Sequence, residues 1–91
     1  MYYFYILRSS KAKKLYLGST PDLKARLKSH NAGENKATKP YIPYKLIFYS
    51  GFISKKDAVD CEQYFKTTAG WKRLNKMLKD SLGQQGSEHK V

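Results

Sequence analysis

Two short strand-like segments, close together in sequence, restrict the fold of this chain more than any other feature. Tyr2–Leu7 is rich in aromatic and β-branched residues, and the polar stretch RSSKAKK separates it from a second such segment, Leu15–Gly18. Strands with so short a connection pair as an antiparallel hairpin. A third segment, Tyr44–Phe52, contains the apolar run LIFY, which is typical of burial on both faces and predicts a strand beside the hairpin.

The sequence between the second and third strands predicts one helix and one loop. Ser19 or Thr20 can cap the helix, and two leucines four residues apart supply its buried face. The helix is expected to end within HNAG, residues 30–33, because Asn and Gly commonly stop helices. Residues 33–43 include two prolines and a glycine, which indicates a loop, and a loop of this length in a small domain is often functional.

Two more helices are expected after the third strand. Ser54 and Asp57 resemble a capping box at the start of the first, and a break at residues 68–70 separates it from the second. The apolar stripe of the last helix consists of Trp71, Leu74, Met77 and Leu78. Residues 83–91 are polar and aperiodic, so a disordered tail is expected after one domain at residues 1–82. The predicted fold is α+β, a three-stranded antiparallel sheet flanked by helices in the order ββαβαα.

The chain carries a large excess of positive charge. It has 18 Lys and Arg against 7 Asp and Glu, a formal net charge of +11, spread from Arg8 to Lys90. Such charge is typical of nucleic-acid binding, so DNA is the expected class of partner. No membrane partner is expected, because the apolar run at the start is too short to span a bilayer. A single cysteine, Cys61, excludes an internal disulfide and is typical of the cytoplasm.

Glu62 is the most informative polar residue. On a helical wheel it falls inside the apolar arc formed by Ala58, Val59, Cys61 and Phe65. A carboxylate directed at the core has to be paired, protonated or metal-bound, because an isolated buried charge is too costly. Two interpretations are open: a structural ion pair with a Lys or Arg, or a ligand for a hard divalent cation, which prefers oxygen donors.

Arg26 and His30 are one turn apart on the first predicted helix and therefore share a face. They are either an ordinary pair of surface side chains or a phosphate clamp. In a clamp, the planar guanidinium binds two phosphate oxygens, and the imidazole donates to a third or transfers a proton.

Tyr5, Tyr16 and Gly18 lie in the predicted hairpin. If the turn places Tyr5 opposite Tyr16, the two rings form a cross-strand pair on one face of the sheet. They either pack the sheet or form a pair of phenols near an arginine, where positive charge would lower a phenol pKa. Gly18 is either a backbone position that other residues resist, or a space for a phosphate near the helix N-terminus.

Five sequence elements resemble, in order and spacing, those of the GIY-YIG nuclease domain. They are Tyr3-Phe4-Tyr5, Tyr16-Leu17-Gly18 after ten intervening residues, Arg26, His30 and the helical Glu62. The similarity extends over residues 2–82 and is greatest to the small stand-alone single-domain members. It implies the same ββαβαα fold and metal-dependent hydrolysis of phosphodiester bonds in DNA, branched or damaged, in the manner of DNA repair enzymes.

The resemblance also implies a role for each matching side chain. Glu62 would be the protein ligand of one divalent ion, Mg²⁺ or Mn²⁺. Tyr16 would be the general base that activates the attacking water. Arg26 would stabilise charge on the transferring phosphate, and Tyr5 and His30 would position the phosphate or the water.

The chain departs from the family pattern beside its second motif. Ser19 occupies a position where the related repair endonucleases tend to carry Lys. A phosphate contact at this position is therefore either missing or supplied by Lys14, Lys36 or Lys39, with Gly18 and Ser19 beside the bound nucleic acid.

A second function is compatible with the same fold. A nucleic-acid-binding module with little or no cleavage activity, targeted by a protein partner, would fit a chain of this size, because relatives with known targets usually add a second DNA-binding domain. A core-directed Glu62 favours the enzyme, because a protein that only binds nucleic acid has no use for it.

Overall fold

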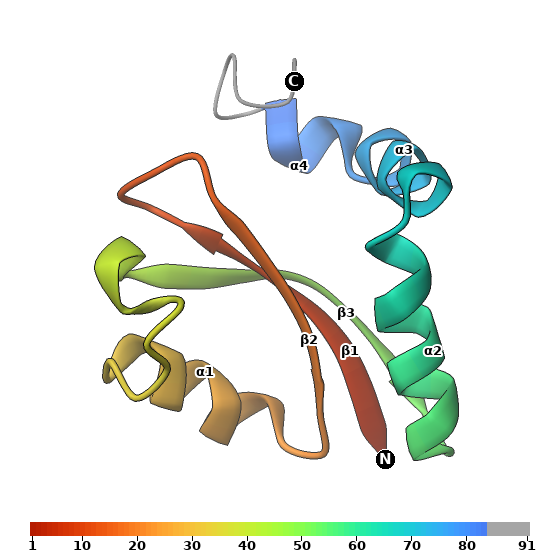
Figure 1. Cartoon of the computed structure of the whole chain (residues 1–91), viewed down its shortest axis with the longest axis horizontal. Coiled ribbons are helices and arrows are strands. Elements are labelled where there is room, and N and C mark those ends of the chain that lie inside the picture. Colours follow the sequence, from red (N-terminus) through yellow and green to blue (C-terminus); the bar gives the residue numbers. More distant parts are fainter. Residues whose placement is uncertain (84–91) are drawn as a thin grey trace.

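The three strands form one antiparallel sheet with the order β2-β1-β3 (Figure 1). In this computed structural model, which describes residues 1–83, β1 spans Tyr2–Ser9, β2 spans Leu15–Thr20 and β3 spans Tyr44–Phe52. The strand predicted beside the hairpin is therefore confirmed. Burial on both faces was wrongly predicted for β3, because β3 is an edge strand and the central β1 is the deeply buried one.

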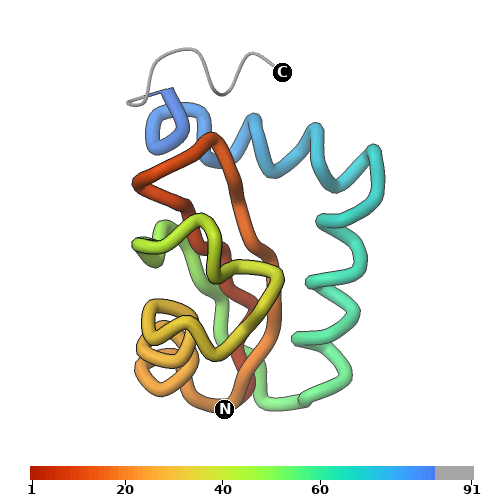
Figure 2. Tube along the Cα trace, turned by 60° about the vertical axis from the view of Figure 1, so that its left-hand side comes forward, coloured from red at the N-terminus to blue at the C-terminus, as the bar shows by residue number. Residues whose placement is uncertain are grey.

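The sheet lies between two helices, α1 (Leu23–Asn31) on one face and α2 (Lys55–Phe65) on the other (Figure 2). Successive strand residues point to opposite faces. Tyr5 and Leu7 of β1 accordingly pack in the cluster under α1, and Phe4 and Ile6 pack with the side chains of α2 and the helices that follow it. The predicted α+β class and its ββαβαα order are confirmed.

Helices α1 and α2 each start at a side-chain cap. Asp22 caps α1 by accepting a hydrogen bond from the Ala25 amide at 3.0 Å. The predicted caps Ser19 and Thr20 are wrong, because both residues remain in β2 and pair with β1. Ser54 caps α2, as predicted.

The C-terminal helices differ from the prediction. Thr67 caps α3 (Thr68–Met77), so residues 68–70 form its first turn rather than a break. Gly70 is required there because a side chain would collide with the Tyr64 carbonyl of α2. The helix is interrupted at Leu78, and a short additional helix, α4 (Lys79–Gly83), follows.

The structure also differs from the sequence analysis at Met77 and in the loop before β3. Met77 is exposed rather than part of the buried stripe, whereas Leu74 and Leu78 are buried. The loop before β3 contains one turn of 3-10 helix, η1 (Lys39–Tyr41). Apart from Gly83, which ends α4, the predicted tail lies outside the described residues. None of the described helices has the length and apolar character needed to cross a membrane.

Candidate active site

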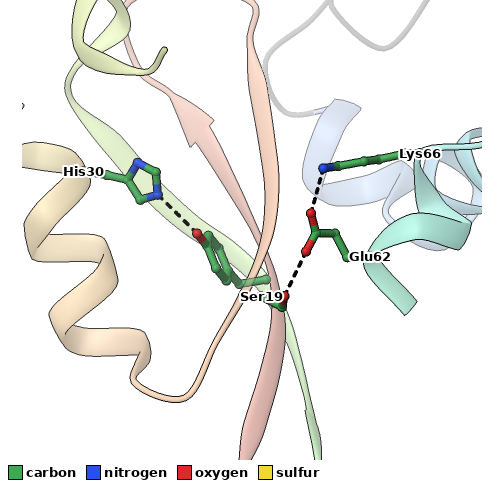
Figure 3. Close-up of polar contacts among 5 residues, drawn as sticks. Ser19, His30, Glu62 and Lys66 are labelled. Atoms are coloured by element: carbon green, nitrogen blue, oxygen red, sulfur yellow. Dashed lines mark hydrogen bonds and ion pairs between the residues drawn. The ribbon is translucent and has the colours of Figure 1, made fainter. Parts of the chain in front are cut away.

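The predicted site residues lie on both sides of the edge strand β2. Gly18 and Ser19 are adjacent in this strand, so Gly18 faces α1 and Ser19 faces α2. Figure 3 shows His30 of α1 on one side of the strand and Glu62 of α2 on the other. The sheet therefore divides the candidate site into a tyrosine–histidine half and a carboxylate half that meet at Gly18–Ser19.

The strand register places the two tyrosines diagonally. Tyr5 pairs with Gly18, and Tyr16 pairs with Leu7, so the predicted direct pairing of Tyr5 with Tyr16 is wrong. Their rings still share one face, with centroids 6.2 Å apart. A Cβ atom at Gly18 would lie 2.6 Å from the Tyr5 hydroxyl, so the glycine leaves room for the phenol.

A chain of hydrogen bonds passes through the buried His30. Thr38 donates its hydroxyl proton to the Asn35 carbonyl at 3.3 Å, so it accepts from His30 Nδ1 at 2.9 Å. His30 Nε2 then carries the lone pair and accepts from the Tyr5 hydroxyl at 3.2 Å. The Arg26 guanidinium donates in turn to the Tyr5 oxygen. Arg26 is thereby connected through two side chains to the loop that holds Thr38.

Burial keeps both central groups of this chain neutral near pH 7. It raises the pKa of Tyr5 to about 12, because desolvation outweighs the opposing hydrogen bond from Arg26. Arg26 does lower this phenol pKa, as expected of a nearby positive charge, but burial has the larger effect, so the net shift of the Tyr5 pKa is upward. Burial also lowers the pKa of His30, and the nearby positive charge of Arg26 lowers it further.

Exposure separates the residues that a ligand can touch from those that position them. Tyr5 and His30 are each 1% exposed, so His30 is not an ordinary surface side chain. Tyr16 and Arg26 are partly exposed. The Tyr16 ring lies 4.7 Å from the His30 ring, between centroids. Of these four residues, only Tyr16 and Arg26 are therefore exposed enough for a ligand to contact them directly on this side of β2.

Glu62 occupies the other half of the site, where its side chain is 15% exposed. Its Oε1 accepts from the Ser19 hydroxyl at 2.8 Å, and its Oε2 pairs with Lys66 Nζ at 2.7 Å (Figure 3). The ion-pair interpretation of this carboxylate is thus realised between α2 and Lys66, the residue that caps the C-terminus of this helix. Glu62 also influences the pKa of Tyr5, so its charge acts across β2.

These residues fit a weakly held divalent cation. Within residues 1–83 no cluster of three or more His, Cys, Asp or Glu could enclose an ion. Glu62 and the Ser19 hydroxyl nevertheless place two hard oxygen atoms together, and Mg²⁺ commonly binds through one or two such groups while it retains most of its water. Lys66 is 47% exposed, so its side chain is free to swing into solvent when an ion replaces it.

The predicted phosphate-binding lysines lie apart from this centre. Lys14 lies over the Tyr41 ring, 5.3 Å from its centroid, and the Lys39 side chain passes Gly33. In the described part of the chain, no hydrogen bond or ion pair connects Lys14, Lys36 or Lys39 to Glu62 or Arg26. Their contact with nucleic acid stays a prediction.

Sequence reasoning did not identify Thr38 or Lys66. Thr38 is 2% exposed and reaches His30 from the loop before β3, and only the length of that loop indicated a functional segment. Lys66 follows Glu62 by four residues, a spacing that favours ion pairs on a helix. The sequence alone could therefore have indicated this pair.

Replacing Thr38 by valine should change the tautomer of His30. Valine has nearly the same shape but cannot accept from Nδ1, so protonation at Nε2, with donation to Tyr5, becomes favourable. The ring nitrogen shifts in long-range ¹H–¹⁵N spectra distinguish the two tautomers. Thr38→Ser keeps the hydroxyl and should give the wild-type spectrum. An unchanged tautomer in Thr38→Val would contradict the assignment.

The comparisons with known proteins agree with this geometry. A family model described as "GIY-YIG catalytic domain" matches residues 1–75. The chain is 42% identical over 82 residues to "UPF0213 protein YsiG" of Lactococcus lactis subsp. lactis (strain IL1403), covering 89% of this chain and 78% of the relative. It is 45% identical over 65 residues to "UPF0213 protein SpyM50708" of Streptococcus pyogenes serotype M5 (strain Manfredo), covering 70% of each. With both tyrosine motifs and Glu62 inside the matched residues, the chain belongs to the GIY-YIG family.

Proposed function

We propose that this protein is a divalent-metal-dependent endonuclease that hydrolyses phosphodiester bonds in DNA, branched or damaged DNA included, in the cytoplasm. One observation carries the proposal. The Glu62 carboxylate accepts a hydrogen bond from Ser19 at 2.8 Å, and the preceding strand residue, Gly18, faces the Tyr5 phenol, on which Arg26 of α1 acts. A metal-binding carboxylate and a phosphate-binding cation are thereby brought to one strand edge of a protein with net charge +11.

Arg26 supplies fixed positive charge for the phosphate. A guanidinium has five N–H donors, so its bond to Tyr5 leaves others for two phosphate oxygens. Because Tyr5 is held by His30, the donor group is oriented before the substrate arrives. Such preorganised charge stabilises the negative charge that develops on the phosphate in the transition state.

Tyr16 is the side chain that we assign to the attacking water. Its ring packs on buried His30 and remains partly exposed. The hydroxyl is therefore available to orient a water molecule beside Arg26, and in its phenolate form it would accept the proton of that water as the new P–O bond forms.

Glu62 and Ser19 would hold the divalent ion, Mg²⁺ or Mn²⁺. When bound, such an ion stabilises negative charge on the leaving oxygen. Lys66 holds the Glu62 carboxylate in place in the free protein. After it is displaced, its ammonium is available for a neighbouring phosphate.

A second function is favoured by the Lys66–Glu62 ion pair. If Lys66 outcompetes the cation, the carboxylate serves only to hold α2 against β2 through Ser19. The protein would then be a nucleic-acid-binding module without cleavage activity, delivered to its target by a protein partner.

Incubation of the full chain with DNA separates the two functions. Supercoiled plasmid, a branched junction and a duplex with an abasic site are each incubated with Mg²⁺, Mn²⁺ or EDTA. The proposal expects nicked or linear products with either ion and none in EDTA. Binding in a gel-shift assay without metal-dependent cleavage of any substrate would overturn the nuclease and leave the binding module.

A further inference from the structure

An open groove of about 350 Å³ lies between the edge of β2 and the junction of α2 with α3. Its walls are formed by Leu15, Tyr16, Leu17, Phe65, Lys66 and Trp71. Two of these residues connect it to the candidate site: Tyr16 packs on His30, and Lys66 pairs with Glu62 at 2.7 Å. The groove therefore adjoins the carboxylate half of the candidate site through Lys66, and it shares Tyr16 with the tyrosine–histidine half on the other face of β2.

We propose that this groove binds one unpaired nucleobase of the nucleic-acid substrate, beside the phosphate that is cleaved. The proposal rests on nucleic acid as the substrate and extends the proposed function. The walls combine aromatic rings and aliphatic side chains with a single cation, Lys66. Aromatic side chains stack on any base, and a neighbouring lysine attracts the phosphate, which together are typical of binding to unpaired strands.

The charge and the size of the groove favour a nucleobase over other occupants. No carboxylate among residues 1–83 lines it, and the chain has a net charge of +11, so an anionic ligand is attracted. Its volume lies in the range of small-molecule sites and accommodates one base with part of its sugar. A base inside a duplex is stacked and paired and has to leave the helix to enter such a groove.

Trp71 reports directly on occupancy, because it is the only tryptophan of the chain. The full-length protein in EDTA is titrated with an eight-nucleotide oligothymidine, a fully paired hairpin closed by a non-nucleotide linker, the same hairpin with one extra thymidine, and that hairpin with an abasic residue at the extra position. Tryptophan fluorescence reports stacking, and the anisotropy of labelled DNA reports binding. The thymidine octamer and the hairpin with the extra base should quench Trp71; the other two should bind without quenching it.

Two variants test whether Trp71 contacts the base. Trp71→Ala should weaken binding of the extra-thymidine hairpin roughly tenfold, the effect of losing one stacked base, with little change for the paired hairpin. Tyr49→Ala is the matched control, because Tyr49 is an exposed aromatic residue (55%) on the opposite edge strand, and it should bind like wild type. Trp71 also packs against the core, so thermal unfolding of the variant is measured alongside.

Equal quenching by the abasic and extra-thymidine hairpins, or binding of the octamer without any quenching, would overturn the proposal. An RNA octamer of the same length distinguishes the two sugars, and quenching by either nucleic acid supports a base in the groove. Because EDTA is present throughout, the result is independent of cleavage. An inactive protein that still shows base-dependent quenching would refute the nuclease alone, and an active one without quenching would refute the groove alone.

Discussion

Glu62→Gln is expected to reduce metal-dependent DNA cleavage by roughly 10³-fold. Glutamine has the shape of glutamate, and its carbonyl oxygen can still accept from Ser19, so the contact between α2 and β2 is retained. The negative charge is lost, however, and a neutral amide binds Mg²⁺ or Mn²⁺ much more weakly than a carboxylate. Initial rates of plasmid nicking over a series of metal concentrations measure the effect, and the residual rate should respond little to added ion.

Asp60→Asn is the matched control for this variant. Asp60 lies on the same helix, pairs with Lys56 at the same i,i+4 spacing and is exposed, so this variant removes an equivalent charge away from β2. It should cleave at the wild-type rate. Both variants lose only a single ion pair, which changes the free energy of unfolding by less than about 1 kcal/mol. Cleavage by Glu62→Gln at the rate of Asp60→Asn would remove Glu62 from the proposed mechanism.

The sequence predicted the elements of the fold well, because they depend on local signals. Richness in aromatic and β-branched residues in Tyr2–Leu7 and the apolar run in Tyr44–Phe52 indicated the strands, and the bounds of β3 agree with the structure. The Ser54 cap of α2 was found for the same reason. Local signals failed at Ser19 and Thr20, which are good caps by type but are held in β2 by pairing with β1.

The candidate site was only partly predictable, because its connections are long-range. Spacing along one helix correctly placed Glu62 toward the sheet, but the hairpin register that sets Tyr5 against Gly18 depends on packing. The burial of His30 depends on Thr38, eight residues away in a loop whose path no periodic pattern describes. The residue types alone likewise could not reveal that burial has a larger effect than the nearby charge on the pKa of Tyr5.

Arg26→Gln should reduce cleavage by about 10²- to 10³-fold, because it removes the preorganised positive charge from the phosphate. It should also raise the pKa of His30 relative to wild type, since Arg26 is one of the two causes that lower it. Cleavage rates measure the first effect, and an NMR titration of the His30 ring measures the second. Lys24→Gln, which removes one exposed positive charge from the same helix, should change neither quantity appreciably.

The change in pKa has a consequence for stability at acid pH. In the wild type, His30 has a lowered pKa in the folded state, so below about pH 6.5 the unfolded state binds a proton that the folded state does not. Stability is therefore lost as the pH falls from about 6.5 through the folded pKa. In Arg26→Gln the folded pKa is higher, and this part of the acid destabilisation should be smaller. Urea unfolding at pH 7.5 and pH 5.0 measures it.

Arg26→Lys separates charge from geometry. Lysine keeps the positive charge near His30, so the pKa of His30 should stay close to its wild-type value. Its ammonium, however, lacks the planar arrangement of N–H groups that binds two phosphate oxygens side by side while another N–H bonds Tyr5. We expect cleavage to fall nearly as far as in Arg26→Gln while the titration of His30 is preserved. Full activity in Arg26→Lys would show that charge alone suffices, and the bond from Arg26 to Tyr5 would then have no part in orienting the phosphate.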